Sequence, residues 1–342
     1  MPIRIAINGF GRIGRSIVRA IYESHLHEDL QVVAINEIAP IEQMAHLLKY
    51  DSIVGRFNQS VSIKKEDNQS LIMIHEDRIA IFNQPSVTEL PWKELKIDIV
   101  LECSGTNSNK DAIQEHIKAG AKKVLLSQPG DRHFDETIVY GFNHQNLLPS
   151  HQIVSNASCT SNCLVPVLNI INQNNNIVCG ASNTIHAAMS DQPVNDGYAP
   201  KLRLTRSAMA SMIPVTTHLS TAVEKFFPQL SGNFSSTAIR VPTINVSMIE
   251  VTLMLNDATD VETINQQIVN FVKNHPYPIV HYCHEPLVSI DFNHIAYSAV
   301  VDLTQTRMAG SHFLKLSLWF DNEWGFANRM LDTTRYWFQL NE

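Results

Sequence analysis

The stretch 155–163 holds a cysteine, Cys159, among small polar residues. An apolar pattern of helical period follows over 164–171, and the hydroxyl residues Ser158 and Thr160 are of the type that begins helices. The thiol would then lie at the positive end of a helix, where free N–H groups favour an anion. We expect this position to lower the pKa of the thiol and to make it a nucleophile. Pro166 removes an early hydrogen bond and is expected to bend the first turns.

A lone cysteine is more often a small buried hydrophobe, so the nucleophile hypothesis needs a partner base. His186, after the strand-like segment 181–185, is the candidate. Beside the thiol, its imidazole would hold the sulfur as thiolate and move protons in later steps. Asn322 carries an amide that could orient a nicotinamide carboxamide. The alternative for His186 is a purely structural histidine, and the alternative for Asn322 is a turn residue at a helix start.

A glycine-rich segment lies between a strand-like stretch at 3–7 and a helical one at 17–21. It consists of Gly9, Phe10, Gly11, Arg12, Ile13 and Gly14. Such glycines permit a tight turn, and the helix start offers N–H groups to a pyrophosphate. Glu37 follows the apolar run 32–35, about 20 residues further on, where a carboxylate binds a free ribose 2′-hydroxyl and repels a 2′-phosphate. The pattern predicts NAD rather than NADP; a glycine-rich turn beside a solvated acid is the alternative.

Further binding candidates are polar residues at the ends of predicted elements. Ser104 and Gly105 follow the apolar strand 98–103 and are candidates for the cofactor cleft, with a simple strand-end turn as the alternative. Arginines stand near hydroxyl residues further along the chain, which suits a phosphate group. The residues concerned are Arg203, Arg206 and Arg240 with Thr205, Thr217 and Thr243. Solvated surface arginine is the alternative interpretation.

The elements that position these residues predict an α/β fold of two parts. Strands and helices alternate up to residue 157, which is typical of a Rossmann doubly wound parallel sheet. β-rich segments near 177–187, 236–256, 286–302 and 312–320, with helices at 205–226 and 260–274, predict an α+β domain with a mixed or antiparallel sheet. We expect 1–157 to bind NAD, completed by a C-terminal helix at about 323–342, and 158–322 to form the catalytic domain.

Length, charge and cysteine content indicate which classes of protein the chain does not belong to. The 342 residues suggest about two domains, and the 44% hydrophobic fraction fits a globular protein. A net charge of −7 with scattered lysines and arginines argues against nucleic-acid binding. We expect no membrane span, no targeting segment and a cytoplasmic location. The five cysteines (Cys103, Cys159, Cys163, Cys179, Cys283) show neither a disulfide framework nor a metal-binding pair, so no metal is expected.

Taken together, these segments resemble the glyceraldehyde-3-phosphate dehydrogenase superfamily over essentially the whole chain. The matching motifs are 7–15, 155–163, 184–187, 240–243 and 321–323. Within the superfamily the chain is most similar to the D-erythrose-4-phosphate dehydrogenases. That closer similarity is carried by 47–51, 291–294, 304–307 and 322–330.

The resemblance implies Cys159 as nucleophile, His186 as its base and Asn322 on the nicotinamide. It implies a homotetramer in which 188–212 is the S-loop. It also implies NAD-dependent oxidation of D-erythrose 4-phosphate to 4-phosphoerythronate through a thiohemiacetal and a thioester, serving pyridoxal phosphate biosynthesis. Two alternatives stay open: a phosphorylating glyceraldehyde-3-phosphate dehydrogenase of glycolysis, and a non-catalytic NAD-binding regulator.

The chain departs from the phosphorylating members around the substrate phosphate. Two threonines that follow the catalytic histidine in those members are replaced here by Met189 and Asp191, and the carboxylate would repel a phosphate. His218 stands where the family has a glycine. The residues that match the anion sites, or remain the best candidates for them, are Ser158, Thr160, Thr217, Arg203 and Arg240. These departures argue against ordinary glycolytic chemistry.

Overall fold

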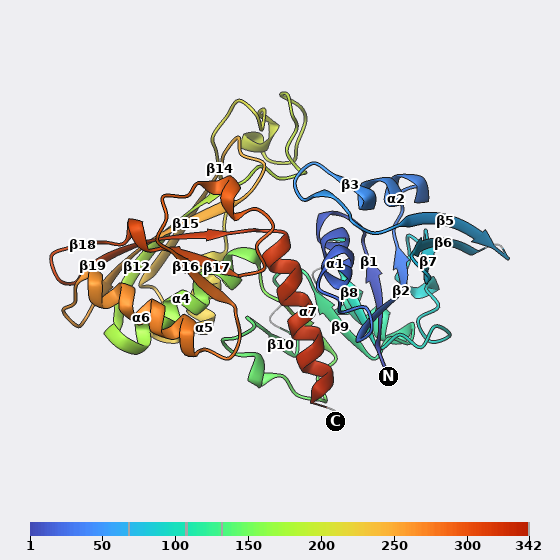
Figure 1. The fold of residues 1–342 in the computed structure, drawn as a ribbon, viewed down its shortest axis with the longest axis horizontal. Helices are drawn as coiled ribbons and strands as arrows, with labels where there is room; N and C mark the ends of the chain where they lie inside the picture. Colours follow the sequence, from blue (N-terminus) through green and yellow to red (C-terminus); the bar gives the residue numbers. More distant parts are fainter. Residues whose placement is uncertain (68, 107–108, 131–132, 341–342) are drawn as a thin grey trace. The chain divides into compact units, whose positions relative to one another are not determined.

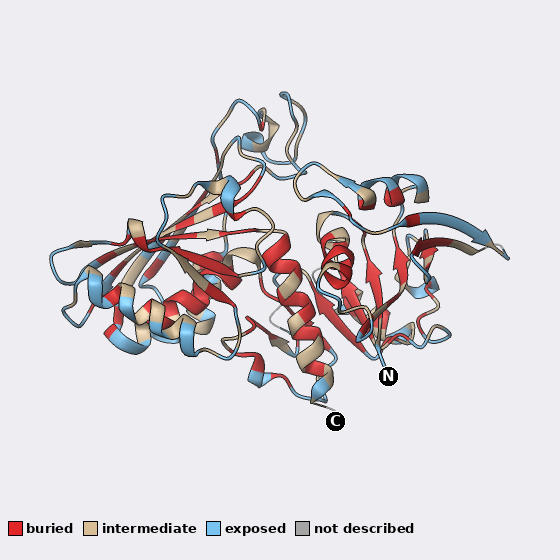
Figure 2. Cartoon of the chain, viewed as in Figure 1, coloured by how far each residue is buried: buried red, intermediate tan, exposed pale blue. Residues whose placement is uncertain are grey.

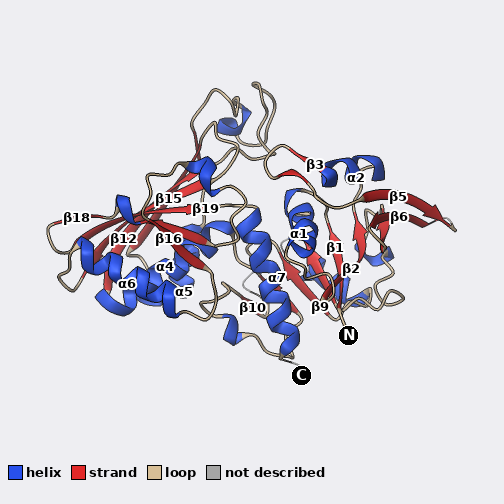
Figure 3. Cartoon of the chain, in the orientation of Figure 1, coloured by secondary structure: helices blue, strands red, loops and turns tan. Residues whose placement is uncertain are grey.

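The computed structural model describes the chain except for residues 68, 107–108, 131–132 and 341–342. The chain divides into two compact units, each described by itself below. Unit 1 consists of Met1–Ser158 and Phe326–Glu342, and unit 2 of Cys159–Gly325. Each unit is built on one large sheet (Figure 1, Figure 3).

Unit 1 contains a sheet with the order β10-β11-β9-β8-β1-β2-β7-β6-β5 among the described residues. The pairs from β10 through β7 are parallel, whereas β5 and β6 add an antiparallel edge. The strands are β1 (Ile3–Asn8), β2 (Leu30–Asn36), β5 (Val61–Glu66), β6 (Gln69–Ile74), β7 (Asp77–Phe82), β8 (Ile99–Glu102), β9 (Lys123–Leu126), β10 (Glu136–Thr137) and β11 (Ile153–Ser155). Strand order reverses between β1 and β8, so a crevice for a ligand is expected beyond their carboxyl ends.

The central strands of this sheet are mostly apolar and mostly buried, as is typical of a parallel sheet (Figure 2). Its helices are α1 (Arg12–Glu23), α2 (Ile41–Lys49), α3 (Lys110–Lys118) and α7 (Trp324–Gln339), with single turns η1 (Val87–Glu89) and η2 (His144–Asn146) and a small hairpin of β3 (Tyr50–Asp51) and β4 (Gly55–Arg56). The predicted C-terminal helix is present as α7. The Thr333 hydroxyl donates to Asn156 Oδ1 over 2.9 Å, which fixes α7 within unit 1.

Unit 2 contains a mixed sheet with the order β13-β14-β12-β15-β19-β17-β16, and β18 pairs with β19. The strands are β12 (Ile177–His186), β13 (Ile213–Val215), β14 (Phe234–Arg240), β15 (Ser247–Leu255), β16 (Val280–Cys283), β17 (Ala299–Asp302), β18 (Arg307–Ala309) and β19 (Phe313–Phe320). Buried residues alternate along β15, as expected for a sheet with one covered face. The helices are α4 (Cys159–Asn175), α5 (Leu219–Phe226) and α6 (Val261–Asn274), with turns η3 (Leu202–Thr205), η4 (Pro228–Leu230), η5 (Ser289–Phe292) and η6 (Leu303–Gln305).

The fold class predicted from the sequence is confirmed, but two local predictions are wrong. A helix was expected over 205–226, whereas the α-helix α5 covers only Leu219–Phe226 and β13 pairs with β14. Pro214 and the β-branched residues beside it disfavour a helix there. Within 286–302 only β17 is a strand, and β16 precedes that segment. In α4, Pro166 lies inside the helix, which continues to Asn175.

Candidate active site and cofactor site

Cys159 is the first residue of α4, as the sequence indicated. The backbone leaves β11 and turns through Ala157, which has the left-handed φ of 57°. The Ser155 side chain stabilises this turn by accepting a hydrogen bond from the Ala157 N–H over 3.1 Å. A non-glycine residue in this conformation is uncommon and is typically found where a site needs a sharp turn. The turn is what allows a strand to be followed at once by a helix beginning at the cysteine.

His186, the last residue of β12, lies beside this thiol. Its Nε2 is 4.0 Å from Cys159 Sγ, and its Nδ1 is 2.8 Å from the Ala187 carbonyl oxygen. A carbonyl can only accept a hydrogen bond, so Nδ1 carries the ring hydrogen and Nε2 presents its lone pair to the sulfur. The structure therefore brings together the two residues that the sequence selected, with the imidazole in the tautomer of a base.

The protonation state of this pair differs from the one predicted. Burial raises the pKa of the Cys159 thiol to about 11, although hydrogen bonds from the Thr160 and Cys159 N–H groups act to lower it. The expectation of a lowered pKa is thus wrong for the protein alone, because the loss of water outweighs the helix start. Burial also lowers the pKa of His186, and the nearby Arg240 guanidinium adds to this effect. Both shifts favour the uncharged form, a neutral imidazole beside a neutral thiol.

Ser247 connects the histidine strand with Asn322. The buried Ser247 hydroxyl accepts a hydrogen bond from the Ala187 N–H over 3.0 Å and donates one to Asn322 Oδ1 over 2.9 Å. Because the Asn322 oxygen is engaged in this way, its amide orientation is fixed. Sequence reasoning missed Ser247, which lies in a strand without any motif. Ser247 reaches Ala187 and Asn322 only because β15 pairs with β12 and β19.

Arg240 ends β14 as the register partner of His186 on the parallel strand β12. Its guanidinium Nη1 donates to Asp191 Oδ1 over 2.7 Å. The structure thus places this phosphate candidate one strand away from the base. Sequence analysis singled out Arg240 and Asp191 separately and did not predict the ion pair between them.

Of the remaining anion-site candidates, Ser158 and Thr160 flank Cys159 in the chain. Thr160 is the second residue of α4, and Ser158 precedes the helix. Thr217 Oγ1 accepts the Leu219 N–H over 3.2 Å at the start of α5, and His218 there is exposed. Arg203 lies exposed in η3, and among the described residues it makes no hydrogen bond or ion pair with Cys159, His186 or Arg240.

In unit 1, two of the three glycines of the 9–14 turn are required by close contacts with the backbone. Gly9 has a φ of 90°, and a Cβ there would come within 2.5 Å of the Ser104 backbone. At Gly14 a Cβ would meet the Gly9 carbonyl oxygen at 2.4 Å. A Cβ at Gly11 would meet no described atom within 4 Å, so the turn has an open face there. The close approach of this turn to Ser104 places both strand ends at the point where strand order reverses.

Glu37 follows β2 and lies beside the same turn. Its Oε2 accepts the Phe10 N–H over 2.7 Å, and its Oε1 accepts the Ile38 N–H over 2.8 Å. Oε1 also accepts the Ala39 N–H over 3.3 Å, so Oε2 is the oxygen with a further lone pair that a ribose hydroxyl can use. The carboxylate predicted to discriminate against a 2′-phosphate is therefore held at the glycine turn.

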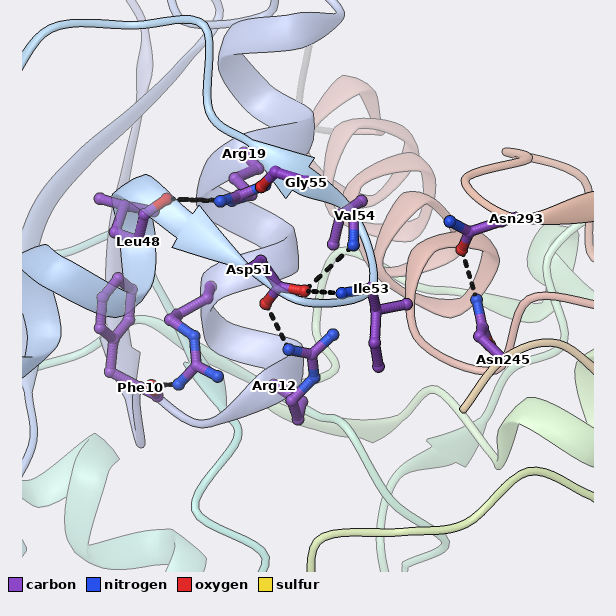
Figure 4. Close-up of polar contacts among 11 residues, drawn as sticks. Phe10, Arg12, Arg19, Leu48, Asp51, Ile53, Val54, Gly55, Asn245 and Asn293 are labelled. Carbon is purple, nitrogen blue, oxygen red and sulfur yellow. Dashed lines mark hydrogen bonds and ion pairs between the residues drawn. The ribbon is translucent and has the colours of Figure 1, made fainter. Parts of the chain in front are cut away.

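The start of α1 is braced by the hairpin of β3 and β4 (Figure 4). The Asp51 carboxylate forms an ion pair with Arg12 and accepts the N–H groups of Ile53 and Val54 over 2.8 and 3.0 Å. Burial alone would raise the pKa of Asp51, but these hydrogen bonds hold it below its ordinary value. Two turns further along α1, Arg19 Nη2 donates to the Leu48 carbonyl over 2.7 Å. The first two turns of α1 are thus held in place by contacts with the segment 48–54.

Both units of the chain match domains of one known protein family. Residues 3–110 match the NAD binding domain of glyceraldehyde 3-phosphate dehydrogenase, and residues 158–322 match its C-terminal domain. The chain belongs to the glyceraldehyde-3-phosphate dehydrogenase family. Its N-terminal domain is accordingly an NAD-binding domain, and its activity is NAD-dependent oxidoreduction of a phosphorylated aldehyde. Among the described residues, no helix is both long enough and apolar enough to cross a membrane.

The residues of unit 1 fit the cofactor. The open face at Gly11 and the N-terminus of α1 suit the pyrophosphate, and Glu37 suits the adenosine ribose. Ser104 and Gly105 lie at the end of β8, next to Gly9, where they can line the same crevice. When bound, NAD supplies the hydride acceptor.

Proposed function

We propose that the chain oxidises D-erythrose 4-phosphate to 4-phosphoerythronate, with Cys159 as nucleophile, His186 as base and water as the final acyl acceptor. The observation that supports the covalent route is the 4.0 Å approach of Cys159 Sγ to the unprotonated Nε2 of His186. The preference for the four-carbon sugar is supported by the resemblance of 47–51, 291–294, 304–307 and 322–330, and by Met189, Asp191 and His218 near the expected phosphate contacts.

In the first step, His186 Nε2 takes the thiol proton as the sulfur attacks the aldehyde carbon. This gives a thiohemiacetal on Cys159. The N–H groups at the start of α4 can stabilise the oxygen of this intermediate, as backbone donors do for other tetrahedral intermediates. The alkoxide oxygen takes the proton back from the imidazolium, which leaves the imidazole free to act again. The imidazole then accepts the hydroxyl proton and releases it to solvent while a hydride leaves for the nicotinamide, which converts the thiohemiacetal into a thioester. The sulfur is then a good leaving group for the second half-reaction.

In the second step, water attacks the thioester carbon while the imidazole takes a proton from it. The C–S bond breaks and the protonated imidazole returns a proton to the sulfur, so that the enzyme is regenerated. If inorganic phosphate attacked instead, an acyl phosphate would leave. The acyl acceptor, water or inorganic phosphate, therefore distinguishes an erythrose-4-phosphate dehydrogenase from a phosphorylating glyceraldehyde-3-phosphate dehydrogenase.

Asn322 is proposed to hold the nicotinamide carboxamide. Its Oδ1 already accepts a hydrogen bond from the Ser247 hydroxyl. This contact sets the orientation of the amide and therefore the direction of its NH₂ group. The anion candidates Arg240, Thr160, Ser158, Thr217 and Arg203 are proposed for the sugar phosphate, with Arg240 favoured because it is the register partner of His186.

We further propose a homotetramer formed with the S-loop at 188–212. This segment exposes several large apolar side chains, which is unusual for a surface that stays in water. They are Met189, Val194, Tyr198, Leu202, Met209 and Met212. A cytoplasmic location and a role in pyridoxal phosphate biosynthesis belong to the same proposal, and the five free cysteines suit a reducing compartment.

The proposal is tested by steady-state NADH formation from erythrose 4-phosphate and from glyceraldehyde 3-phosphate, each with and without inorganic phosphate. We expect the higher kcat/KM with the four-carbon sugar and no requirement for phosphate. Preference for the triose together with strong phosphate dependence would show a glycolytic enzyme instead. NAD binding without oxidation of either aldehyde would favour a regulator.

A further inference from the structure

The buried carboxylate of Asp321 lies between β19 and Asn322. Its Oδ1 accepts the N–H groups of Glu323 and Trp324 over 3.0 and 2.9 Å, which closes the turn that leads into α7. An aspartate oxygen that accepts N–H groups two and three residues further on is a common start of a helix. The backbone on the C-terminal side of Asn322 is therefore fixed by the residue before it.

The other oxygen of Asp321 joins this turn to two segments that are distant in the sequence. Oδ2 accepts a hydrogen bond from Asn245 Nδ2 and one from the His294 N–H, each over 2.9 Å. Asn245 Nδ2 also donates to Asn293 Oδ1 over 2.8 Å, so the two segments are bound to each other (Figure 4). His294 has a left-handed φ of 66°, which a non-glycine residue keeps only where its surroundings hold it. One carboxylate thus ties three segments of unit 2 together.

These contacts continue the pairing of β15 with β19 as far as Asn322. The antiparallel ladder of the two strands ends at the pair of Ser247 and Phe320. Beyond that pair, the Asn245 side chain bonds to Asp321. The Ser247 hydroxyl bonds to Asn322 Oδ1 over 2.9 Å. Ser247 thus orients the Asn322 amide, but the place of the residue itself depends on the turn that Asp321 holds.

The same carboxylate acts on the nucleophile. Burial is the main reason why the pKa of the Cys159 thiol is raised, and the negative charges of Glu323 and Asp321 add to it. Asp321 is therefore close enough to the sulfur for its charge to be felt. Hydride transfer needs the reacting groups in one geometry, and a misplacement of about 1 Å can cost about a hundredfold in rate. A turn held in this way near the sulfur suits a residue that must orient the nicotinamide.

We propose that Asp321 is a positioning residue for the cofactor: its carboxylate holds the turn at 321–324 so that the Asn322 amide keeps the nicotinamide in one orientation. The inference rests on one part of the proposed function, the contact of Asn322 with the carboxamide, and not on the identity of the sugar or of the acyl acceptor. Without this contact, rotation about the glycosidic bond would expose the opposite face of the ring. The hydride would then add to the other side of C4, so the stereochemistry of the NADH reports on the orientation.

The decisive variant is Asp321→Asn, which removes the charge and preserves the size. Its matched control is Asp302→Asn in the same unit. Asp302 is equally buried, and its carboxylate accepts three hydrogen bonds from Thr304 and Trp319. Both substitutions therefore disturb a buried, hydrogen-bonded acid, but only one of them adjoins Asn322.

A second pair of variants keeps the test decisive if Asp321→Asn does not fold. Asn245→Ala removes one donor and leaves the carboxylate in place. Asn175→Ala is its control, because Asn175 is similarly buried but donates to Gln267 from the C-terminal end of α4. Asn322→Ala is made in parallel, since it removes the proposed contact with the carboxamide itself.

Each enzyme oxidises the better of the two aldehydes, deuterated at the aldehyde carbon, and proton NMR of the NADH shows which side of C4 has received deuterium. The wild type should label one side. In Asp321→Asn we expect label on both sides and a calorimetric dissociation constant for NAD about tenfold higher, as for the loss of a hydrogen bond to a charged group. Iodoacetamide alkylation of Cys159 without NAD should accelerate at lower pH, because a charge that raises the pKa of this thiol is gone. Asp302→Asn and Asn175→Ala should lose stability in thermal unfolding without any of these changes.

Two outcomes separate this role from the proposed function. If Asn322→Ala labels both sides of C4 but Asp321→Asn labels one side and binds NAD as the wild type does, the positioning role is refuted and the contact of Asn322 with the nicotinamide stands. If Asn322→Ala behaves as the wild type, that contact is refuted and the positioning role with it. Where Asp321→Asn does not fold, Asn245→Ala is judged by the same criteria.

Discussion

His116 and Glu102 are both buried, and the imidazole Nε2 lies 2.9 Å from the carboxylate. The Trp92 Nε1–H donates to the other ring nitrogen over 3.0 Å, so the histidine is neutral and donates its single N–H to Glu102. The same carboxylate accepts from Asn8 Nδ2 over 2.6 Å and from the Ser104 N–H over 2.8 Å. It therefore joins the ends of β1 and β8, between which the cofactor crevice is expected.

Replacing Glu102 by Gln should destabilise the protein by about 3 kcal/mol, because an NH₂ group would face buried donors that now share a charged acceptor. Burial would raise the pKa of Glu102, but the hydrogen bonds from His116, Ser104 and Asn8 outweigh it and hold this pKa below 4.5. The charge-dependent stability is thus present above pH 4.5 and is lost as the pH falls through the folded-state pKa. Denaturant unfolding at several pH values checks this. A difference between wild type and variant that does not shrink in acid would contradict it.

Much of the molecule follows from short-range patterns. The strand, glycine turn and helix at 3–23 and the helix after Cys159 were predicted because residue spacing alone encodes them. The helix expected over 205–226 failed because β13 is stabilised by pairing with β14, a contact distant in the sequence. Ser247 and the partnership of Asp191 with Arg240 could not be predicted for the same reason. Pairing between strands decides which side chains meet, and a single sequence does not give that pairing.

Replacing Cys159 by Ser should lower the oxidation of erythrose 4-phosphate at least about a thousandfold, because a hydroxyl is a far weaker nucleophile than a thiol and gives a poorer leaving group. The residues that fit the pyrophosphate and the adenosine ribose belong to unit 1, and the substitution leaves Asn322 in place, so the dissociation constant for NAD should change little. Steady-state NADH formation and calorimetric NAD titration measure the two quantities. A variant that keeps full activity would refute Cys159 as the nucleophile.

Alkylation of Cys159 by iodoacetamide without NAD should keep accelerating well above pH 9, because burial raises the pKa of this thiol to about 11. The thiolate is the reactive form, so the rate follows its fraction as the pH rises. The Cys159→Ser variant serves as the control, since Cys103, Cys163, Cys179 and Cys283 are also free. A rate that levels off below pH 8 would instead indicate a thiolate–imidazolium pair.

Replacing Ser247 by Ala should raise the KM for NAD more than it lowers kcat, because the hydroxyl orients Asn322 and does not touch the sulfur. The change also leaves the Ala187 N–H without its acceptor, which costs about 1–3 kcal/mol when the group is buried. Thermal unfolding in parallel separates the two effects. Loss of stability with an unchanged KM would mean that Ser247 only supports the strand.

Replacing Thr333 by Val tests how α7 is held in unit 1. The valine keeps the shape of the side chain but removes the fully buried hydrogen bond to Asn156 Oδ1, so we expect unfolding to become easier by about 1–2 kcal/mol. Trp337 Nε1 also donates to the Leu148 carbonyl over 3.1 Å, so the helix keeps a second attachment and should not detach. Hydrogen exchange of α7 amides should therefore rise only in proportion to the global loss of stability. Selective exchange of α7 in the variant would show that Thr333 is its main anchor.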